Sequence, residues 1–240
     1  MKDLLFLDVE ATGIADEDRL IQVAYRHNQT ELNMLFKPPL PIKLPAMAVH
    51  HVTQAMVDDK EEFRGSSAMV GLSILANEDT VLVAHNAKYD LGMLAREGLL
   101  FKRHICTLKI ARYIDKDGRF ENHQLQYLRY FYGIEVEAVA HDAFGDIVVL
   151  EAVFAKLYDD FVSFEFPGEV VSEFAVLTRM VEISMQPSLL THIRFGKYNG
   201  KTIEEVRKAD KGYLEWLLDA KLKKPEGEED WIYTLNYYLK

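Results

Sequence analysis

Residues 4–13 read LLFLDVEATG, and this stretch decides how we expect the chain to fold. The four apolar residues predict a strand leaving the core, and the alternation of Asp8, Val9 and Glu10 continues it. Successive side chains of a strand point to opposite faces, so Asp8 and Glu10 share one face. Thr12 and Gly13 then let the backbone turn and offer amide donors. The stretch predicts two carboxylates at the end of a strand, where open sheets bind ligands.

The segments that follow predict the rest of a mixed sheet. Residues 19–25 and 31–36 read as strands joined by a turn at 27–30, and residues 80–84 and 105–107 read as two further strands. Helical patterns are expected at 46–57, 68–77, 86–97, 108–114, 122–132, 143–158 and 173–184. Three antiparallel strands followed by strands alternating with helices place the chain in the α/β class, with helices on both faces of the sheet.

Length and turn signals predict one large domain with a small companion. The chain has 240 residues, and proline and glycine at 167–168 and 185–188 bracket a helical pattern. We expect a main domain at 1–165, a bridging segment at 166–187 and a small, mainly helical module at 188–240. In that module Thr202 and Glu205 have the spacing of a capping box.

Composition favours a globular protein of a reducing compartment. Hydrophobic residues make up 49% of the chain, and the single cysteine, Cys106, cannot form an internal disulfide. No apolar run approaches the ~18–20 residues that span a bilayer, and the amino terminus does not resemble a secretion signal. We therefore expect a cytoplasmic protein without a membrane partner.

The charge is unevenly distributed along the chain. The net charge is −10, made up of +1 for residues 186–240 and −11 for the rest. Net charge alone argues against a nucleic-acid partner. An acidic chain can still bind a polyanion if its carboxylates surround divalent cations, which then become the largest local charges.

Three short motifs could supply such carboxylates, and each also has a structural interpretation. Asp8 and Glu10 could be a plain polar strand end. Asn86 and Asp90 are four residues apart on an expected helix and would share a face, but Asn86 could simply cap that helix. His141 and Asp146 can converge if His141 lies on the loop before the expected helix, although a lone histidine is more often a surface or core residue.

Taken together, the motifs supply four acids and one histidine at strand ends and helix starts. Carboxylate oxygens suit Mg²⁺ or Mn²⁺ better than zinc. Two such ions ~3.5–4 Å apart support in-line attack on a phosphodiester, and a histidine with a near-neutral pKa can act as the general base.

These motifs, in this order, resemble those of the DnaQ-like 3′-to-5′ exonucleases of the DEDDh type. Asp8 and Glu10 match the first motif, Asp90 the second, and His141 with Asp146 the third. Residues 42–57 resemble the segment that this family places beside the substrate's 3′ end, and residues 83–90 also match. Residues 195–218 resemble the small carboxyl-terminal module of the exonuclease X type. One departure is Ala11, where many members have threonine.

The resemblance implies a ribonuclease H-like fold and a role for each matching residue. Asp8, Glu10 and Asp146 would bind the first of two Mg²⁺ or Mn²⁺ ions, with Asp8 bridging to the second. Asp90 would act largely through metal-bound water, and His141 would accept a proton from the attacking water. Residues near the terminal nucleotide would be Thr12, Gly13, Ile14, Val49, His50 and Asn86. For His50 the alternative is a surface pair with His51.

The implied activity is release of 5′-mononucleotides from DNA 3′ ends, in repair or DNA turnover. The DNA would be single-stranded, or duplex with a frayed or mismatched end. Alternatives are a 3′-to-5′ exoribonuclease acting on RNA or short oligonucleotides, and a catalytically inactive module that binds nucleic acid. The carboxyl-terminal module could bind DNA through Lys197, Tyr198 and Lys201, or it could be a helical cap that only docks on the main domain, with Tyr198 and Trp216 buried.

Overall fold

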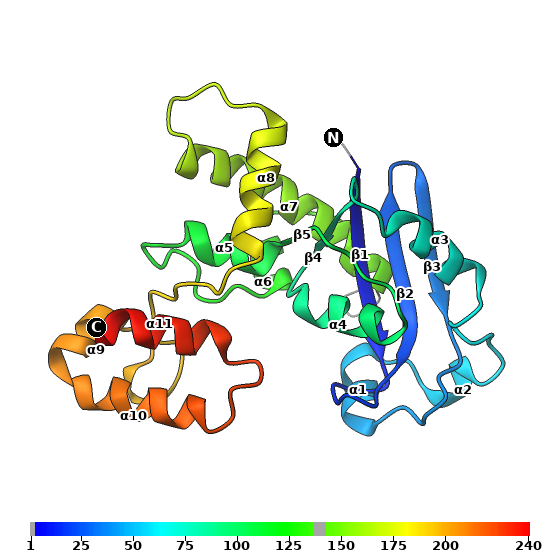
Figure 1. The fold of residues 1–240 in the computed structure, drawn as a ribbon, viewed down its shortest axis with the longest axis horizontal. Helices are drawn as coiled ribbons and strands as arrows, with labels where there is room; N and C mark the ends of the chain where they lie inside the picture. The colour runs from blue at the N-terminus through cyan, green and yellow to red at the C-terminus, as the bar shows by residue number, and fades with distance from the viewer. Residues whose placement is uncertain (1–2, 137–142) are drawn as a thin grey trace. The chain divides into compact units, whose positions relative to one another are not determined.

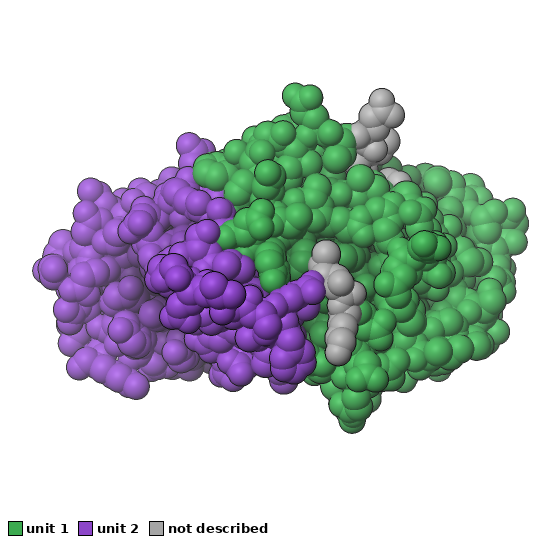
Figure 2. All heavy atoms as spheres, turned by 90° about the horizontal axis from the view of Figure 1, so that it is seen from above, with its two compact units in different colours: residues 1–107, 125–159 green, residues 108–124, 160–240 purple. Residues whose placement is uncertain are grey.

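The computed structural model describes residues 3–136 and 143–240, and the chain divides into two compact units. Unit 1 consists of Met1–Thr107 with Leu125–Asp159, and unit 2 of Leu108–Gln124 with Asp160–Lys240. Figure 2 colours the two units separately. The three-part division into 1–165, 166–187 and 188–240 stays a prediction.

Unit 1 is built on a mixed five-stranded sheet in the order β3-β2-β1-β4-β5 (Figure 1). Its strands are β1 (Leu4–Ala11), β2 (Leu20–His27), β3 (Thr30–Leu35), β4 (Val81–Ala84) and β5 (His104–Cys106). The first three pair antiparallel, whereas β1 with β4 and β4 with β5 pair parallel. The mixed sheet expected from the sequence is confirmed.

Helices cover both faces of this sheet. On one face, the Phe6 ring of β1 packs against Phe154 of α7 (Ala143–Glu165), with ring centroids 5.4 Å apart. Tyr25, which pairs with Leu7 and therefore points to the other face, lies beside Gly71 of α3 (Ser67–Leu75). The other helices that lie wholly in unit 1 are α1 (Leu44–His50), α2 (Gln54–Val57), α4 (Lys88–Arg96) and α6 (Leu125–Phe131).

Two helices differ most from their expected extents. The expected helix at 46–57 is two short helices, because His51 adopts a left-handed conformation with a φ of 60° and its amide bonds to the Met47 carbonyl. That conformation ends α1, and Thr53 starts α2 as its N-cap. Helix α7 continues to Glu165, beyond the expected end at 158, because the apolar residues that continue there allow another turn.

Unit 2 contains α5 (Thr107–Ile114, entering from Leu108), α8 (Glu173–Ser184), a short 3₁₀ turn (Gly196–Tyr198), α9 (Ile203–Ala209), α10 (Lys211–Leu222) and α11 (Glu229–Leu239). One apolar cluster of this unit consists of Ile193, Ile203, Val206, Leu214, Leu217 and Leu235. The predicted capping box is confirmed: Thr202 Oγ1 accepts from the Glu205 amide at 3.1 Å, and Glu205 Oε2 accepts from the Thr202 amide at 2.8 Å. Within residues 3–136 and 143–240, no helix is long and apolar enough to cross a membrane.

Candidate active site

The first two predicted ligands lie on the face of β1 that α7 covers. Asp8 and Glu10 are half-buried and alternate with the buried Val9 and Ala11. They follow Phe6 at intervals of two residues, so they point to the same face as the Phe6 ring, which packs against α7. The pairing of β1 with β2 shifts register between Glu10 and Ala11. Such irregularities of a strand are common next to functional sites. The predicted carboxylate pair is therefore on one face, at the carboxyl end of the central strand.

Asp90 reaches the same end of β1 from the first turn of α4. Pairing between β1 and β4 stops at Phe6, which leaves the Val9 amide beyond the ladder. That amide donates to Asp90 Oδ1 at 3.2 Å. Burial and, to a smaller extent, the nearby charge of Glu10 raise the pKa of Asp90 to about 8, although its hydrogen bonds to backbone amides lower it. A carboxyl group so close to a second carboxylate is costly to ionise without a cation.

Asp146 lies in the first turn of α7, and its Oδ1 accepts a hydrogen bond from Gln126 Nε2 at 2.7 Å. His141 lies outside the described residues. Within the described part of the chain, no group of three or more His, Cys, Asp or Glu side chains is arranged to hold a metal ion. The joint ligand set of Asp8, Glu10, Asp90 and Asp146 therefore stays a prediction.

The loop after β1 is organised by a buried carboxylate, that of Asp18. Its oxygens accept from Thr12 Oγ1 at 2.7 Å, from the Ala15 amide at 2.8 Å and from Lys43 Nζ at 2.7 Å. Burial alone would raise the pKa of Asp18, but the hydrogen bonds from Lys43, Thr12 and Ala15 lower it below its ordinary value. The Thr12 hydroxyl also accepts from the Arg19 amide at 3.1 Å. Because this fully buried hydroxyl already has two partners, it shapes the loop.

Gly13 and Ile14 occupy contrasting positions in that loop. Gly13 is not among the residues at positive φ, so its role differs from the sharp turn that we expected. A Cβ at this position would lie 2.5 Å from Asp18 Oδ2 and 2.9 Å from Lys43 Cδ, so close approach explains the glycine. The next side chain, Ile14, is 86% exposed and is available to a ligand.

The segment predicted to lie beside the substrate does approach β1. The Lys43 amide donates to the Thr12 carbonyl at 3.0 Å. His50 is buried and its Nδ1 accepts from the Val52 amide at 3.0 Å, so a surface pair with His51 is wrong for this residue. Burial lowers the pKa of His50, although the nearby Ala11 carbonyl favours its protonated form. Val49 is 52% exposed and can contact a ligand.

The sequence interpretation of Asn86 needs correction. Helix α4 begins at Lys88 with Ala87 as its N-cap, so Asn86 neither caps it nor shares a helical face with Asp90. Asn86 instead lies in the preceding turn at a φ of 63°, a left-handed conformation that asparagine tolerates well. Its side chain is exposed whereas Asp90 is buried. A role for Asn86 in binding substrate stays a prediction.

The sequence interpretation assigns no role to three residues of the site. Gln126 donates to Asp146, and Asp18 accepts from Thr12. No local spacing in the sequence predicts either contact. Tyr89 lies among the acids: burial raises the pKa of its hydroxyl, and the charges of Glu10, Asp90 and Asp8 raise it further. Only its place next to Asp90 in the sequence could have drawn attention to it.

In the carboxyl-terminal module, the basic and aromatic residues singled out from the sequence are partly engaged within unit 2. Lys197 Nζ forms an ion pair with Asp210 at 3.0 Å, and the Tyr198 hydroxyl donates to Asp210 at 2.7 Å. Trp216, which the docking-cap interpretation expects to be buried, is 60% exposed, and its ring lies 5.6 Å from that of Tyr213. Whether this module binds DNA stays a prediction.

Comparisons with known proteins match both parts of the chain. Residues 5–154 match the family described as Exonuclease, and residues 193–221 match the family described as Exodeoxyribonuclease X-like C-terminal. The chain is 28% identical over 197 residues to the protein named Exodeoxyribonuclease 10 of Escherichia coli strain K12, covering 78% of this chain and 76% of the relative. It is 30% identical over 161 residues to the Uncharacterized exonuclease CP81 of Escherichia phage 186, covering 60% and 82%.

Solved structures share the fold. Exonuclease X in complex with 5′ overhanging duplex DNA matches with a TM-score of 0.56 and 21% identity, covering 75% of this chain and 99% of that one. Escherichia coli exonuclease I in complex with single-stranded DNA, in its zinc-bound form, matches with a TM-score of 0.56 and 20% identity, covering 70% of this chain and 42% of that one. The ribonuclease H-like architecture expected from the sequence is confirmed.

Proposed function

Because the chain belongs to the exonuclease family, we propose that it is a metal-dependent 3′-to-5′ exodeoxyribonuclease of the DEDDh type. It releases 5′-mononucleotides from the 3′ ends of single-stranded DNA, or of duplex DNA with a frayed or mismatched end, in DNA repair or turnover. The observation that carries the proposal is the buried Asp90 carboxyl group, bound to the Val9 amide and close to Glu10 at the end of β1.

The donor atoms at this site suit divalent cations that prefer oxygen. Asp90 is 2% exposed, and among the described residues no cationic side chain offsets the rise in its pKa. Adjacent buried carboxylates are stabilised when a cation neutralises them. Carboxylate oxygens favour Mg²⁺ or Mn²⁺ over zinc. Asp8, Glu10, Asp90 and Asp146 would hold two such ions.

The chain's own residues fix the geometry of the reaction. Bound divalent ions would neutralise the carboxylates and stabilise the charge that develops on a phosphodiester. The Val9 amide orients Asp90, and Gln126 orients Asp146. His141, which precedes α7 in the sequence, would accept the proton of the attacking water at an imidazole nitrogen.

Substrate contacts would come from the loop after β1 and from α1. The exposed Ile14 offers an apolar surface to the terminal base, and Val49 offers a second one. Contacts to a base face and to the chain end, without readout of base edges, would give action that is largely independent of sequence. DNA is favoured as the substrate because one relative is named an exodeoxyribonuclease and the solved relatives are complexes with DNA.

The polarity and the substrate can be tested in one experiment. Purified protein is incubated with single-stranded DNA, mismatched duplex DNA and RNA of the same sequence, labelled at either end, with Mg²⁺ or with EDTA. We expect 5′-labelled DNA to shorten stepwise and 3′-labelled DNA to release labelled mononucleotide at once, only with Mg²⁺. Internal fragments, the reverse polarity or full activity in EDTA would contradict the proposal, and faster loss of RNA would favour the exoribonuclease alternative.

A further inference from the structure

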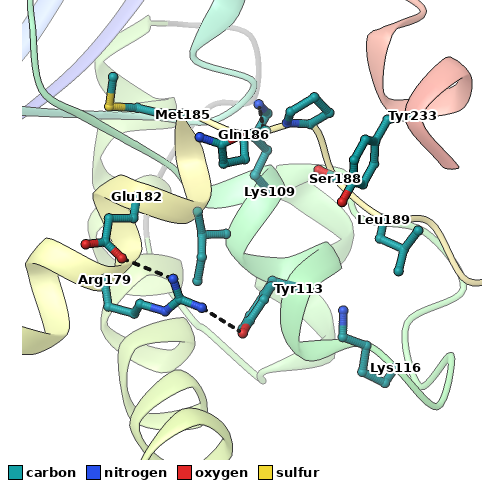
Figure 3. Close-up of a pocket in the computed structure, with 12 residues that line it drawn as sticks. Lys109, Tyr113, Lys116, Arg179, Glu182, Met185, Gln186, Ser188, Leu189 and Tyr233 are labelled. Carbon is teal, nitrogen blue, oxygen red and sulfur yellow. Dashed lines mark hydrogen bonds and ion pairs between the residues drawn. The ribbon is translucent and has the colours of Figure 1, made fainter. Parts of the chain in front are cut away.

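Unit 2 contains a cavity of about 630 Å³ that the proposed nuclease reaction does not use. Its lining residues come from α5, the loop that follows it with Lys116, α8, the segment 185–189 and α11 (Figure 3), and all of them belong to unit 2. The volume falls within the range of about 300–1,000 Å³ that small-molecule sites occupy. The size of the cavity therefore suits a small organic ligand.

One cationic side chain of the lining is already neutralised. Arg179 Nε contacts Glu165 Oε1 at 2.7 Å and its Nη1 contacts Glu182 at 3.0 Å. Its Nη2 lies 3.5 Å from the Tyr113 hydroxyl, which donates to Glu165 Oε2 at 2.7 Å. Figure 3 shows Arg179 and Glu182 pointing toward each other on α8, with Tyr113 beside them. These four residues form a hydrogen-bonded wall with a formal charge of −1.

The other two cationic side chains of the lining are Lys109 and Lys116. Lys109 Nζ donates to the backbone carbonyls of Ser184 at 3.0 Å and Gln186 at 2.7 Å, which are neutral acceptors. Lys116 forms no ion pair within the described part of the chain, and its Nζ lies 4.7 Å from the centre of the Tyr113 ring. Burial lowers the pKa of Lys116 against the charges of Asp115 and Glu165. An anion bound beside Lys116 would stabilise its ammonium group.

The rest of the lining suits a flat ring. Tyr233 is 46% exposed, and Ile183, Met185 and Leu189 add apolar surface. Figure 3 shows Tyr233 and Leu189 near one another, on the opposite side of the view from Arg179. The Ser188 hydroxyl, which also lines the cavity, is buried and has no hydrogen-bond partner among the described residues. Aromatic and apolar walls with a few polar groups are typical of sites for organic ligands.

We propose that this cavity binds a nucleoside 5′-monophosphate, with the phosphate beside Lys116 and the base against Tyr233 and Leu189. Lys116, which forms no ion pair within the described part of the chain, favours an anion. The apolar and aromatic surface selects a ligand with a ring over inorganic phosphate. The choice of a nucleotide among ring-bearing anions rests on the proposed function, which releases that class of product.

Calorimetric titration in EDTA tests the proposal, with dAMP, inorganic phosphate and a 12-nucleotide single-stranded DNA as probes. The proteins are the wild-type chain, Lys116→Gln, Tyr233→Ala, Asp8→Asn and the control Lys224→Gln, which removes an exposed lysine outside the cavity. Circular dichroism confirms that each variant is folded. Tyr233→Ala provides a second variant of the cavity in case Lys116→Gln alters the fold.

We expect dAMP to bind the wild-type chain with a dissociation constant below ~1 mM and to bind Lys116→Gln about tenfold or more weakly, as loss of a charged hydrogen bond predicts. Tyr233→Ala should also weaken binding, and Asp8→Asn and Lys224→Gln should leave it unchanged. Equal affinity for phosphate, binding of the oligonucleotide alone, loss of binding in Asp8→Asn, or no effect in either cavity variant would overturn the proposal. A chain that binds dAMP through Lys116 but cleaves no DNA would contradict only the proposed function.

Discussion

Replacing Asp18 with alanine should destabilise the protein and misplace the loop that follows β1. The carboxylate is fully buried and accepts hydrogen bonds from Thr12 Oγ1 at 2.7 Å, from the Ala15 amide at 2.8 Å and from Lys43 Nζ at 2.7 Å. The Lys43 side chain is 45% exposed, so solvent screens that ion pair. The other two bonds, at about 1.5–3 kcal/mol each, set the expected loss in the free energy of unfolding at about 3–6 kcal/mol.

The loss should depend on pH in a defined direction. The hydrogen bonds of Asp18 outweigh burial and lower the pKa of its carboxyl group in the folded state below 3.8. Because the folded pKa is lowered, the stabilisation is present above the unfolded value and is lost as pH falls through the folded value. The difference in stability between the wild-type chain and Asp18→Ala should therefore be full at pH 7 and should narrow below 3.8.

Urea unfolding at pH 7, followed by circular dichroism, measures this difference directly. Lys43→Ala is the matched control, and it should cost no more than about 1 kcal/mol because its ammonium group is solvent-accessible. Asp18→Ala should also lower kcat/KM on DNA, by up to about 100-fold, because Thr12, Gly13 and Ile14 lose their position. An Asp18→Ala protein within about 0.5 kcal/mol of the wild-type chain, or a Lys43→Ala protein that is equally destabilised, would refute the reasoning.

Three further predictions concern Gly13, Asp90 and Trp216. Gly13→Ala should lower the free energy of unfolding by about 1–3 kcal/mol, because the added Cβ would lie 2.5 Å from Asp18 Oδ2. The loss should be smaller in the Asp18→Ala background, which a double-mutant cycle of unfolding measurements checks. Asp90→Asn should stabilise the metal-free protein in EDTA, because the raised pKa makes an ionised Asp90 costly in the folded state. The gain in the free energy of unfolding should grow by up to about 1.4 kcal/mol per pH unit between about pH 4 and 8. Thermal melts across that range measure the gain, and a gain that does not change with pH would contradict the prediction. Trp216→Ala should weaken single-stranded DNA binding about tenfold with an unchanged melting temperature, as fluorescence anisotropy can show, and unchanged affinity would favour a docking cap.

The sequence predicts those parts of the fold that local pattern determines. The apolar run before Asp8 predicts the central strand, and period-two alternation predicts the shared face of Asp8 and Glu10. The Thr202–Glu205 spacing predicts a helix start that the structure confirms. Each of these features depends on neighbours within four residues, so a single sequence is sufficient to find it.

The features that the sequence does not predict depend on contacts between distant segments. The pairing of β4 with β1 ends before Val9, so the Val9 amide is free to donate to the buried Asp90 carboxyl group. The two residues lie 81 positions apart in the sequence. Gln126 meets Asp146 across 20 residues. The sequence pattern predicts Asn86 as the cap of a helix, but Asn86 adopts a left-handed conformation in the turn between β4 and α4. Tertiary geometry sets these positions, and local propensity does not record it.

In the proposed function, the carboxylates at the end of β1 support metal-dependent removal of nucleotides from DNA 3′ ends. The most direct test is the initial rate of 5′-mononucleotide release from single-stranded DNA with Mg²⁺, for the wild-type chain and for Asp8→Asn. The control is Asp79→Asn, an exposed acid before β4, at the opposite end of the sheet. We predict that Asp8→Asn, folded as judged by circular dichroism, releases mononucleotides at least ~10³-fold more slowly than the wild-type chain. Asp79→Asn should keep the wild-type rate. A folded Asp8→Asn protein that releases mononucleotides at the wild-type rate would contradict the account.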